Sequence, residues 1–179
     1  MGASDRTLVH RAGRYYRVAD PWWDDPLNPS FASRNGGRWN PPGISVLYLS
    51  GSVEVARANV DRLFVGLPYG PEDLDSAACP ILVEVVIPPD EYVDAVTGEG
   101  LNRLGLPKSY PLDAGGRIVP HSACRPIGLA AYEDGEPGIA CRSAAPGANG
   151  EELVWFALPE RAIPPRGQAR SFDEWFWGS

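Results

Sequence analysis

Residues 36–64, GGRWNPPGISVLYLSGSVEVARANVDRLF, decide the fold that we expect for this chain. A Gly- and Pro-rich turn leads into the apolar and aromatic run 45–49, which predicts a buried strand. Ser52 then suits a helix N-cap, and apolar residues recur at helical spacing as far as Phe64. The stretch therefore predicts a loop, a buried strand and a helix that packs against the core.

The other strands and a second helix are expected on both sides of this stretch. Strand-like runs occupy residues 14–18, 81–87, 138–141 and 153–157. The second helix begins at Pro126, which suits a first helical turn, and ends near Tyr132. Because strands dominate, we predict a single α+β domain with small mixed or antiparallel sheets and a few helices. It is expected over 14–160, between an N-terminal tail (1–13) and a C-terminal tail (161–179) whose aromatic end docks on the domain.

Charge and composition exclude several classes of function. The chain has 179 residues, with 16 basic and 23 acidic side chains and a net charge of −7, which argues against binding duplex nucleic acid. Its three cysteines and two histidines form no CxxC or HExxH motif, so we expect no metal site. It begins without the apolar region of a signal peptide, and no apolar run is long enough to span a membrane. We therefore expect a soluble, cytoplasmic protein.

The densest candidate site lies in the long irregular segment 20–43, where three tryptophans favour an ordered loop over disorder. Gly36 and Gly37 let backbone amides approach a ligand closely, and Arg38 can make fork-like hydrogen bonds to phosphate oxygens. The alternative interpretation is a tight turn with a solvated arginine and Trp39 packed beneath it.

Three more polar residues lie on or just after the expected strands. Arg17 either pairs with an acidic residue or awaits an anionic ligand, since arginine is rarely buried alone. Tyr48 by itself is typical of a core tyrosine whose hydroxyl is hydrogen-bonded. Ser143 lacks a surrounding GxSxG motif, so its pattern does not indicate a hydrolase nucleophile.

The order of these blocks resembles the RES domain family over about residues 14–157. The matching blocks are Tyr16-Arg17, Gly36–Pro41, Leu47–Ser50 before a helix, Gly138–Pro146 and Leu153–Phe156. The resemblance implies a fold akin to ADP-ribosyltransferase toxins and cleavage of the nicotinamide–ribose bond of NAD⁺ by water or phosphate. NAD⁺ or a related nucleotide would be the substrate, with no separate cofactor and no metal. It further implies a bacterial toxin neutralised by an Xre-type antitoxin; a homodimer is left open.

Carried over by position, the resemblance also implies roles for individual residues. Arg17 and Arg38 would hold the pyrophosphate, Tyr48 with a tryptophan would flank the nicotinamide or its ribose, and Ser143 would fix a polar group of either. The further substrate-binding positions expected are Gly36, Gly37, Trp39, Asn40 and Arg142.

One position departs from the family, which carries a glutamate eleven residues beyond the strand tyrosine. That position is Asn59, which can bond ribose hydroxyls but brings no negative charge. Glu54 or Asp61 could substitute, although neither spacing shares the helix face of Asn59. Alternatively, the reaction tolerates asparagine, as in ADP-ribosyl transfer to a macromolecule or a step on an NAD-like substrate. The last alternative is a module that binds NAD or ADP-ribose without turnover.

Overall fold

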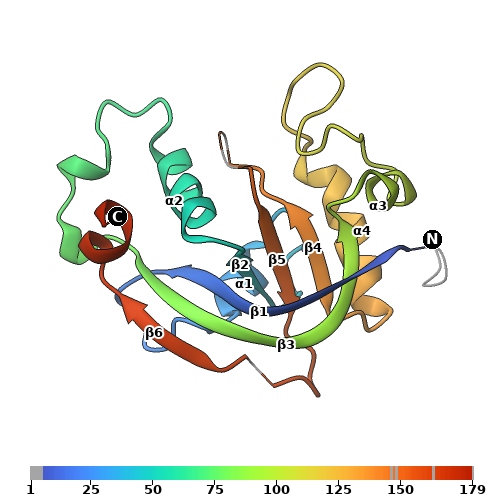
Figure 1. Cartoon of the computed structure of the whole chain (residues 1–179), viewed down its shortest axis with the longest axis horizontal. Coiled ribbons are helices and arrows are strands. Elements are labelled where there is room, and N and C mark those ends of the chain that lie inside the picture. Colours follow the sequence, from blue (N-terminus) through green and yellow to red (C-terminus); the bar gives the residue numbers. More distant parts are fainter. Residues whose placement is uncertain (1–5, 146, 148, 163, 179) are drawn as a thin grey trace.

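Six strands form one mixed sheet in the order β1-β2-β5-β4-β3-β6 (Figure 1). The structure is a computed structural model, and it describes residues 6–145, 147, 149–162 and 164–178. The strands are β1 (Leu8–Ala19), β2 (Val46–Ser50), β3 (Ile81–Ala95), β4 (Gly138–Arg142), β5 (Glu151–Phe156) and β6 (Arg166–Arg170). β3 and β4 are parallel, whereas the other pairs are antiparallel. Because β1 also pairs with β3 along most of its length, five of the strands close into a ring.

Helices lie at two ends of this sheet, and one short helix lies beside β2. They are α1 (Ser30–Asn35), α2 (Val53–Asp61), α3 (Gly98–Arg103) and α4 (His121–Glu133), with a helical turn at Asp173–Trp177. Short 3-10 turns cover Arg62–Phe64, Pro71–Asp73 and Ser76–Ala78. Figure 1 shows α2 and the C-terminal turn at one end, α3 and α4 at the other, and β1 and β3 curving side by side beneath them. The expected single-domain α+β fold with a mixed sheet and a few helices is confirmed.

The strand–helix unit at the centre of the sequence forms as its pattern predicts. β2 is buried along its length except for Tyr48, which is partly exposed. Ser52 caps α2 by accepting a hydrogen bond from the Val55 amide at 3.2 Å, and the helix buries Val55, Ala56 and Val60. A strand buried on both faces and an amphipathic helix thus follow each other after one tight turn.

Several elements differ from the sequence expectations. β1 begins at Leu8, so part of the expected tail 1–13 is strand; residues 1–5 lie outside the described part of the chain. β3 continues through Pro88-Pro89 to Ala95, and β6 and α1 were not expected. A proline at the end of an apolar run indicates a strand end, but pairing with β1 carries the strand onward.

α4 begins at His121, five residues before the expected start at Pro126. Pro126 contributes no N–H to the helix, yet Cys124, Ile127 and Ala131 are buried on its inner face on both sides of the proline. Tertiary packing therefore keeps the chain helical through Pro126, the residue at which local preference predicted that the helix begins.

The C-terminal segment packs against α2 and the start of β3. Phe172, Trp175 and Phe176 are buried in one cluster with Ala56 and Val60 of α2. The indole of Trp175 donates to the Pro80 carbonyl at 2.9 Å. Within the described part of the chain, no helix is both long and apolar enough to cross a membrane.

Candidate functional site

A cleft with two connected hollows lies between β2, α2 and the loop before β2. The helix hollow, about 360 Å³, includes Asn59 of α2, and the loop hollow, about 280 Å³, includes Gly36, Gly37 and Arg38. Five residues line both hollows: Arg17, Phe31, Tyr48, Arg62 and Glu152. The two expected arginines and the expected tyrosine thus share the loop hollow, although they come from distant parts of the sequence.

Strand register gathers polar side chains on the cleft face of the sheet. Ser50 of β2 and Cys141 of β4 both lie opposite Glu152 of β5, and Tyr48 lies two residues before Ser50. Because side chains alternate along a strand, these residues share one face, and Ser143 continues that face two residues after Cys141. The register therefore brings Tyr48, Glu152 and Ser143 together.

Arg17 is a buried cation that has no acidic partner in the part of the chain that the structure describes. Its side chain is enclosed (the residue is 7% exposed), and among the described residues it forms no ion pair. One guanidinium nitrogen donates to the Tyr48 carbonyl at 3.2 Å, whereas the buried Nε finds no hydrogen-bond partner among the residues described. The guanidinium also lies 5.7 Å from the ring of Trp23. Burial lowers the pKa of Arg17 to about 10, which leaves it charged at neutral pH.

Tyr48 ties the glycine-rich loop to the sheet. Its hydroxyl accepts a hydrogen bond from the Trp39 amide at 2.9 Å and donates one to Asn40 Oδ1 at 2.8 Å. Burial raises the pKa of this hydroxyl well above its ordinary value, so it stays protonated. A Cβ on Gly37 would collide with the same hydroxyl, which explains why this position requires glycine. The ring of Tyr48, rather than its hydroxyl, is therefore the part available to a ligand.

The carboxylate of Glu152 lies between Asn59 and Ser143. The Asn59 amide donates to Glu152 Oε1 at 2.7 Å, and the Ser143 hydroxyl donates to the same oxygen at 2.8 Å. Ser143 is itself buried and lines neither hollow, so it reaches the cleft only through Glu152. Asn59 does line the helix hollow.

The two acids considered as substitutes for the missing glutamate lie elsewhere. Glu54 is exposed in the first turn of α2, and Asp61 lines a different hollow with Trp177. Neither borders the cleft, whereas Glu152 borders both of its hollows. Glu152 is visible in the sequence as one of two adjacent glutamates at the start of β5. Only the pairing of β5 with β2 and β4 shows that its carboxylate lies at the cleft.

Three other expected binding residues have structural contacts instead of a place in the cleft lining. Trp39 and Asn40 are fully buried, and the Asn40 amide donates to the carbonyls of Ala32 and Ile44. Arg142 donates to the carbonyls of Val96, Lys108 and Tyr110. Trp39 and Asn40 thus support the loop that presents Arg38, and Arg142 fastens the segment after β3.

Sequence reasoning missed several residues that line the cleft. Arg62 follows α2, Phe31 belongs to α1, and His121 begins α4. Arg62 and Arg38 give the cleft two more cations beside Arg17, and Arg38 also donates to the Val119 carbonyl at 2.6 Å. The cleft is therefore cationic within a chain whose net charge is −7.

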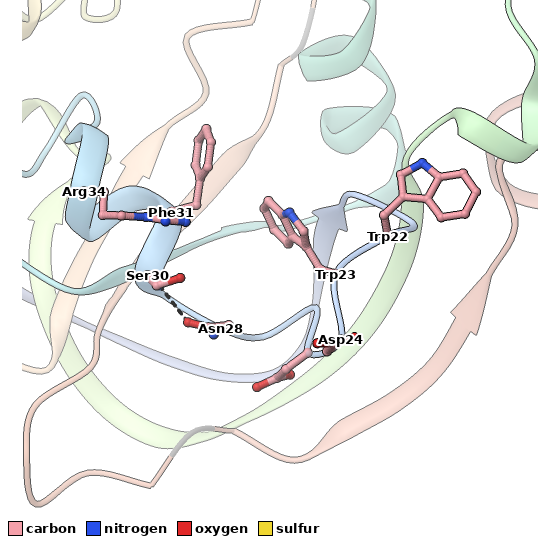
Figure 2. A pocket seen from close by; sticks show the side chains of 8 residues that line it. Trp22, Trp23, Asp24, Asn28, Ser30, Phe31 and Arg34 are labelled. Carbon is pink, nitrogen blue, oxygen red and sulfur yellow. Dashed lines mark hydrogen bonds between the residues drawn. The ribbon is translucent and has the colours of Figure 1, made fainter.

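The long loop before α1 adds an aromatic wall next to this cleft. Trp22, Trp23 and Phe31 line a further hollow of about 280 Å³, and the rings of Trp23 and Phe31 lie 5.8 Å apart. Figure 2 shows these two rings near each other and Trp22 standing apart from them. Phe31 belongs to this hollow and to both hollows of the cleft, so the aromatic wall continues into the site. Across the described residues, no group of three His, Cys, Asp or Glu side chains could hold a metal ion.

Comparison with known proteins places this chain in a family. The model of the RES domain matches residues 8–173. The chain belongs to the RES domain family. The match starts and ends beyond the limits 14–160 expected from the sequence, and thus includes all of β1 and part of the C-terminal segment.

A solved structure shares the fold of this RES domain. It is a chain in the crystal structure of the M. tuberculosis MbcT–MbcA toxin–antitoxin complex, with a TM-score of 0.77 and 22% sequence identity. The match covers 97% of this chain and 93% of that chain. Comparison with curated proteins finds no match.

Proposed function

We propose that this RES domain cleaves the nicotinamide–ribose bond of NAD⁺ or a closely related dinucleotide, with water or phosphate as the acceptor. The observation that carries the proposal is Arg17, a buried cation with an unpartnered Nε, in the same hollow as Arg38. A diphosphate supplies the negative charge and the acceptor oxygens that these guanidinium groups lack. Membership of an NAD-related family supports the same choice.

The rest of the cleft suits the other parts of a dinucleotide. The rings of Tyr48 and Phe31 offer apolar faces to a flat nicotinamide, and Phe31 is 52% exposed. Arg62 is positioned to strengthen the attraction of the diphosphate, since it lines both hollows. In this proposal the diphosphate occupies the loop hollow, and the scissile ribose lies toward Asn59 in the helix hollow.

The decisive experiment is nicotinamide release from NAD⁺ by the purified chain, with and without phosphate. Release is expected in both conditions if water is the acceptor, and strong dependence on phosphate indicates phosphorolysis. Without release, the proposal is overturned. Thermal stabilisation by ADP-ribose without release would then support a module that only binds the nucleotide, since a ligand of the native state raises its stability.

A macromolecular acceptor is distinguished by a second arm of the same experiment. NAD⁺ labelled on its adenylate half is incubated with cell lysate and the chain. Under the main proposal the label remains in small molecules; transfer to protein or nucleic acid would identify an ADP-ribosyltransferase instead.

We also propose an antitoxin partner, on the ground that the matching crystal structure is that of a toxin–antitoxin complex. Expression of the chain alone in a bacterial host is expected to lower cellular NAD⁺ and arrest growth. Co-expression with a neighbouring Xre-type gene is expected to restore growth. Normal growth and normal NAD⁺ in cells that accumulate folded chain would contradict both parts of this proposal.

A further inference from the structure

The cleft contains one carboxylate and three arginines. Among the described residues that line the two hollows, Glu152 is the only acid, and Arg17, Arg38 and Arg62 are the cations. Such an acid would ordinarily form an ion pair with one of them. Yet within the described chain Glu152 forms no ion pair.

Two neutral groups hold Glu152 in place instead. Asn59 and Ser143 both donate to Oε1, at 2.7 and 2.8 Å, and Ser143 in turn accepts the Ala145 amide at 3.2 Å. Neutral donors orient a carboxylate without cancelling its charge. The other oxygen, Oε2, makes no hydrogen bond to any residue that the structure describes. One oxygen is thus anchored, and the other is free to meet a ligand.

The position of this carboxylate matches a charge requirement of glycosidic cleavage. When the C–N bond of NAD⁺ breaks, its electron pair leaves with nicotinamide, which becomes neutral, and the positive charge passes to the ribosyl oxocarbenium. Water or hydrogen phosphate then bonds to that carbon through oxygen, and the proton of an attacking water passes to solvent. A fixed carboxylate beside the ribose stabilises the cation that develops between these two steps.

We propose that Glu152 is the catalytic carboxylate of this site, with its free oxygen against the ribose, and that Asn59 is its positioning residue. This inference rests on the proposed cleavage of NAD⁺. Asn59 on α2 cannot supply a negative charge. In this assignment the charge comes instead from a residue of β5, Glu152, which accepts a hydrogen bond from Asn59. Ser143 acts from behind the cleft by holding the anchored oxygen.

The first test replaces the charge but not the shape of the side chain. Glu152→Gln is expected to lower the rate of nicotinamide release by about 10²–10³, while ADP-ribose still raises the melting temperature. The matched control is Glu54→Gln, which makes the same change of charge on exposed α2 and is expected to keep the wild-type rate. A wild-type rate in Glu152→Gln overturns the role of Glu152 and leaves the proposed function intact. If the wild-type chain releases no nicotinamide, both proposals fall.

The second test exchanges the two partners across their hydrogen bond. The double variant Asn59→Glu with Glu152→Gln keeps one carboxylate and one amide in contact, so it is expected to recover part of the rate lost in Glu152→Gln. A purely structural role for this contact predicts recovery of the melting temperature without recovery of the rate per folded molecule. If Glu152→Gln does not fold, Glu152→Asp provides the comparison: it keeps the charge and should exceed the double variant Glu152→Asn with Asn59→Asp in rate. Equal rates for these two would overturn the assignment to residue 152.

Discussion

Glu151 and Glu152 are neighbours on β5, but their surroundings are opposite. Glu151 meets Arg11 of β1 in a two-pronged ion pair, with Nη2 and Oε2 2.7 Å apart. Glu152 points to the other face of the sheet, where its partners are neutral and the nearby arginines stay unpaired with it. Arg11 and Arg17 of β1 also differ in their partners, because Arg11 meets a carboxylate, whereas Arg17 meets none among the described residues. The first pair is closed on itself, whereas the charges of the second set line the cleft without pairing with one another.

Removal of Arg17 should give the largest effect. Arg17→Met is expected to lower the rate of nicotinamide release by at least about 10²–10³, because it removes a directed charge from the diphosphate site. Its free energy of unfolding without ligand should stay unchanged or rise by about 1–4 kcal/mol, because a buried unpaired cation is lost. Initial rates and thermal unfolding with and without ADP-ribose measure both. If Arg17→Met keeps the wild-type rate and is still stabilised by ADP-ribose, the contrast between a structural Arg11 and a ligand-binding Arg17 is wrong.

A Cβ at Gly37 should give the next effect. Gly37→Ala pushes on the Tyr48 hydroxyl and on Asn40, so the loop that presents Arg38 must shift. We expect a loss of about 1–3 kcal/mol in stability and up to about 10² in rate. Gly98→Ala is the control, since its Cβ would meet nothing within 4 Å and the residue has no positive φ. If both variants have the same stability and rate, the inference that Tyr48 fixes the position of the loop is wrong.

Loss of the Arg11–Glu151 ion pair should lower stability but not rate, whereas loss of a cleft arginine should lower the rate. Arg11→Met leaves the Glu151 carboxylate without its cation and is expected to lower the free energy of unfolding by about 1–3 kcal/mol. The rate of nicotinamide release per folded molecule should not change, because Arg11 and Glu151 line neither hollow of the cleft. Denaturant unfolding and initial rates at saturating NAD⁺ test this. A loss of rate without a loss of stability would contradict the division between the two faces.

The smallest expected effect is a dependence of binding on pH. Burial and the nearby Arg38, Arg125 and Arg62 lower the pKa of His121, so in the free chain it is neutral at pH 7. Since the unfolded chain binds this proton more readily, the stability contributed by neutral His121 is present above pH 6.5 and falls as the pH drops below it.

A bound diphosphate should raise that pKa again, because it opposes the three arginines. ADP-ribose binding near pH 6 is therefore expected to take up protons and to tighten as the pH falls. Calorimetry in buffers of different ionisation enthalpy measures the uptake, and His121→Gln should abolish it. Uptake that persists in His121→Gln would assign the proton to another group.

Local pattern predicted the elements more accurately than their ends. The strand around Tyr48, the Ser52 cap and the helix after it follow from alternation and helical spacing, which are properties of short segments. The predicted beginning of α4 at Pro126 was wrong, because packing of Cys124 and Ile127 outweighs the preference of Pro126 for a first turn. β6 was not expected because its exposed sequence, Arg166–Arg170, carries no apolar signal and forms by pairing with β3.

The candidate site divides in the same way. Arg17, Arg38 and Tyr48 stood out by residue type and by their resemblance to the RES family, and the fold brings them to one hollow. Glu152 did not stand out, since a glutamate beside another glutamate at a strand end is ordinary in a sequence. Its meaning depends on partners 93 and 9 residues away, Asn59 and Ser143.

The amino-acid sequence by itself determined which side chains exist for the chemistry and which short segments become strand or helix, because both depend on neighbouring residues. Tertiary structure alone decided which carboxylate is paired with a cation and which is left facing the cleft. The physical reason is register. One step along β5 turns a side chain to the opposite face of the sheet, and the pairing with β2 and β4 determines which residues surround it on that face.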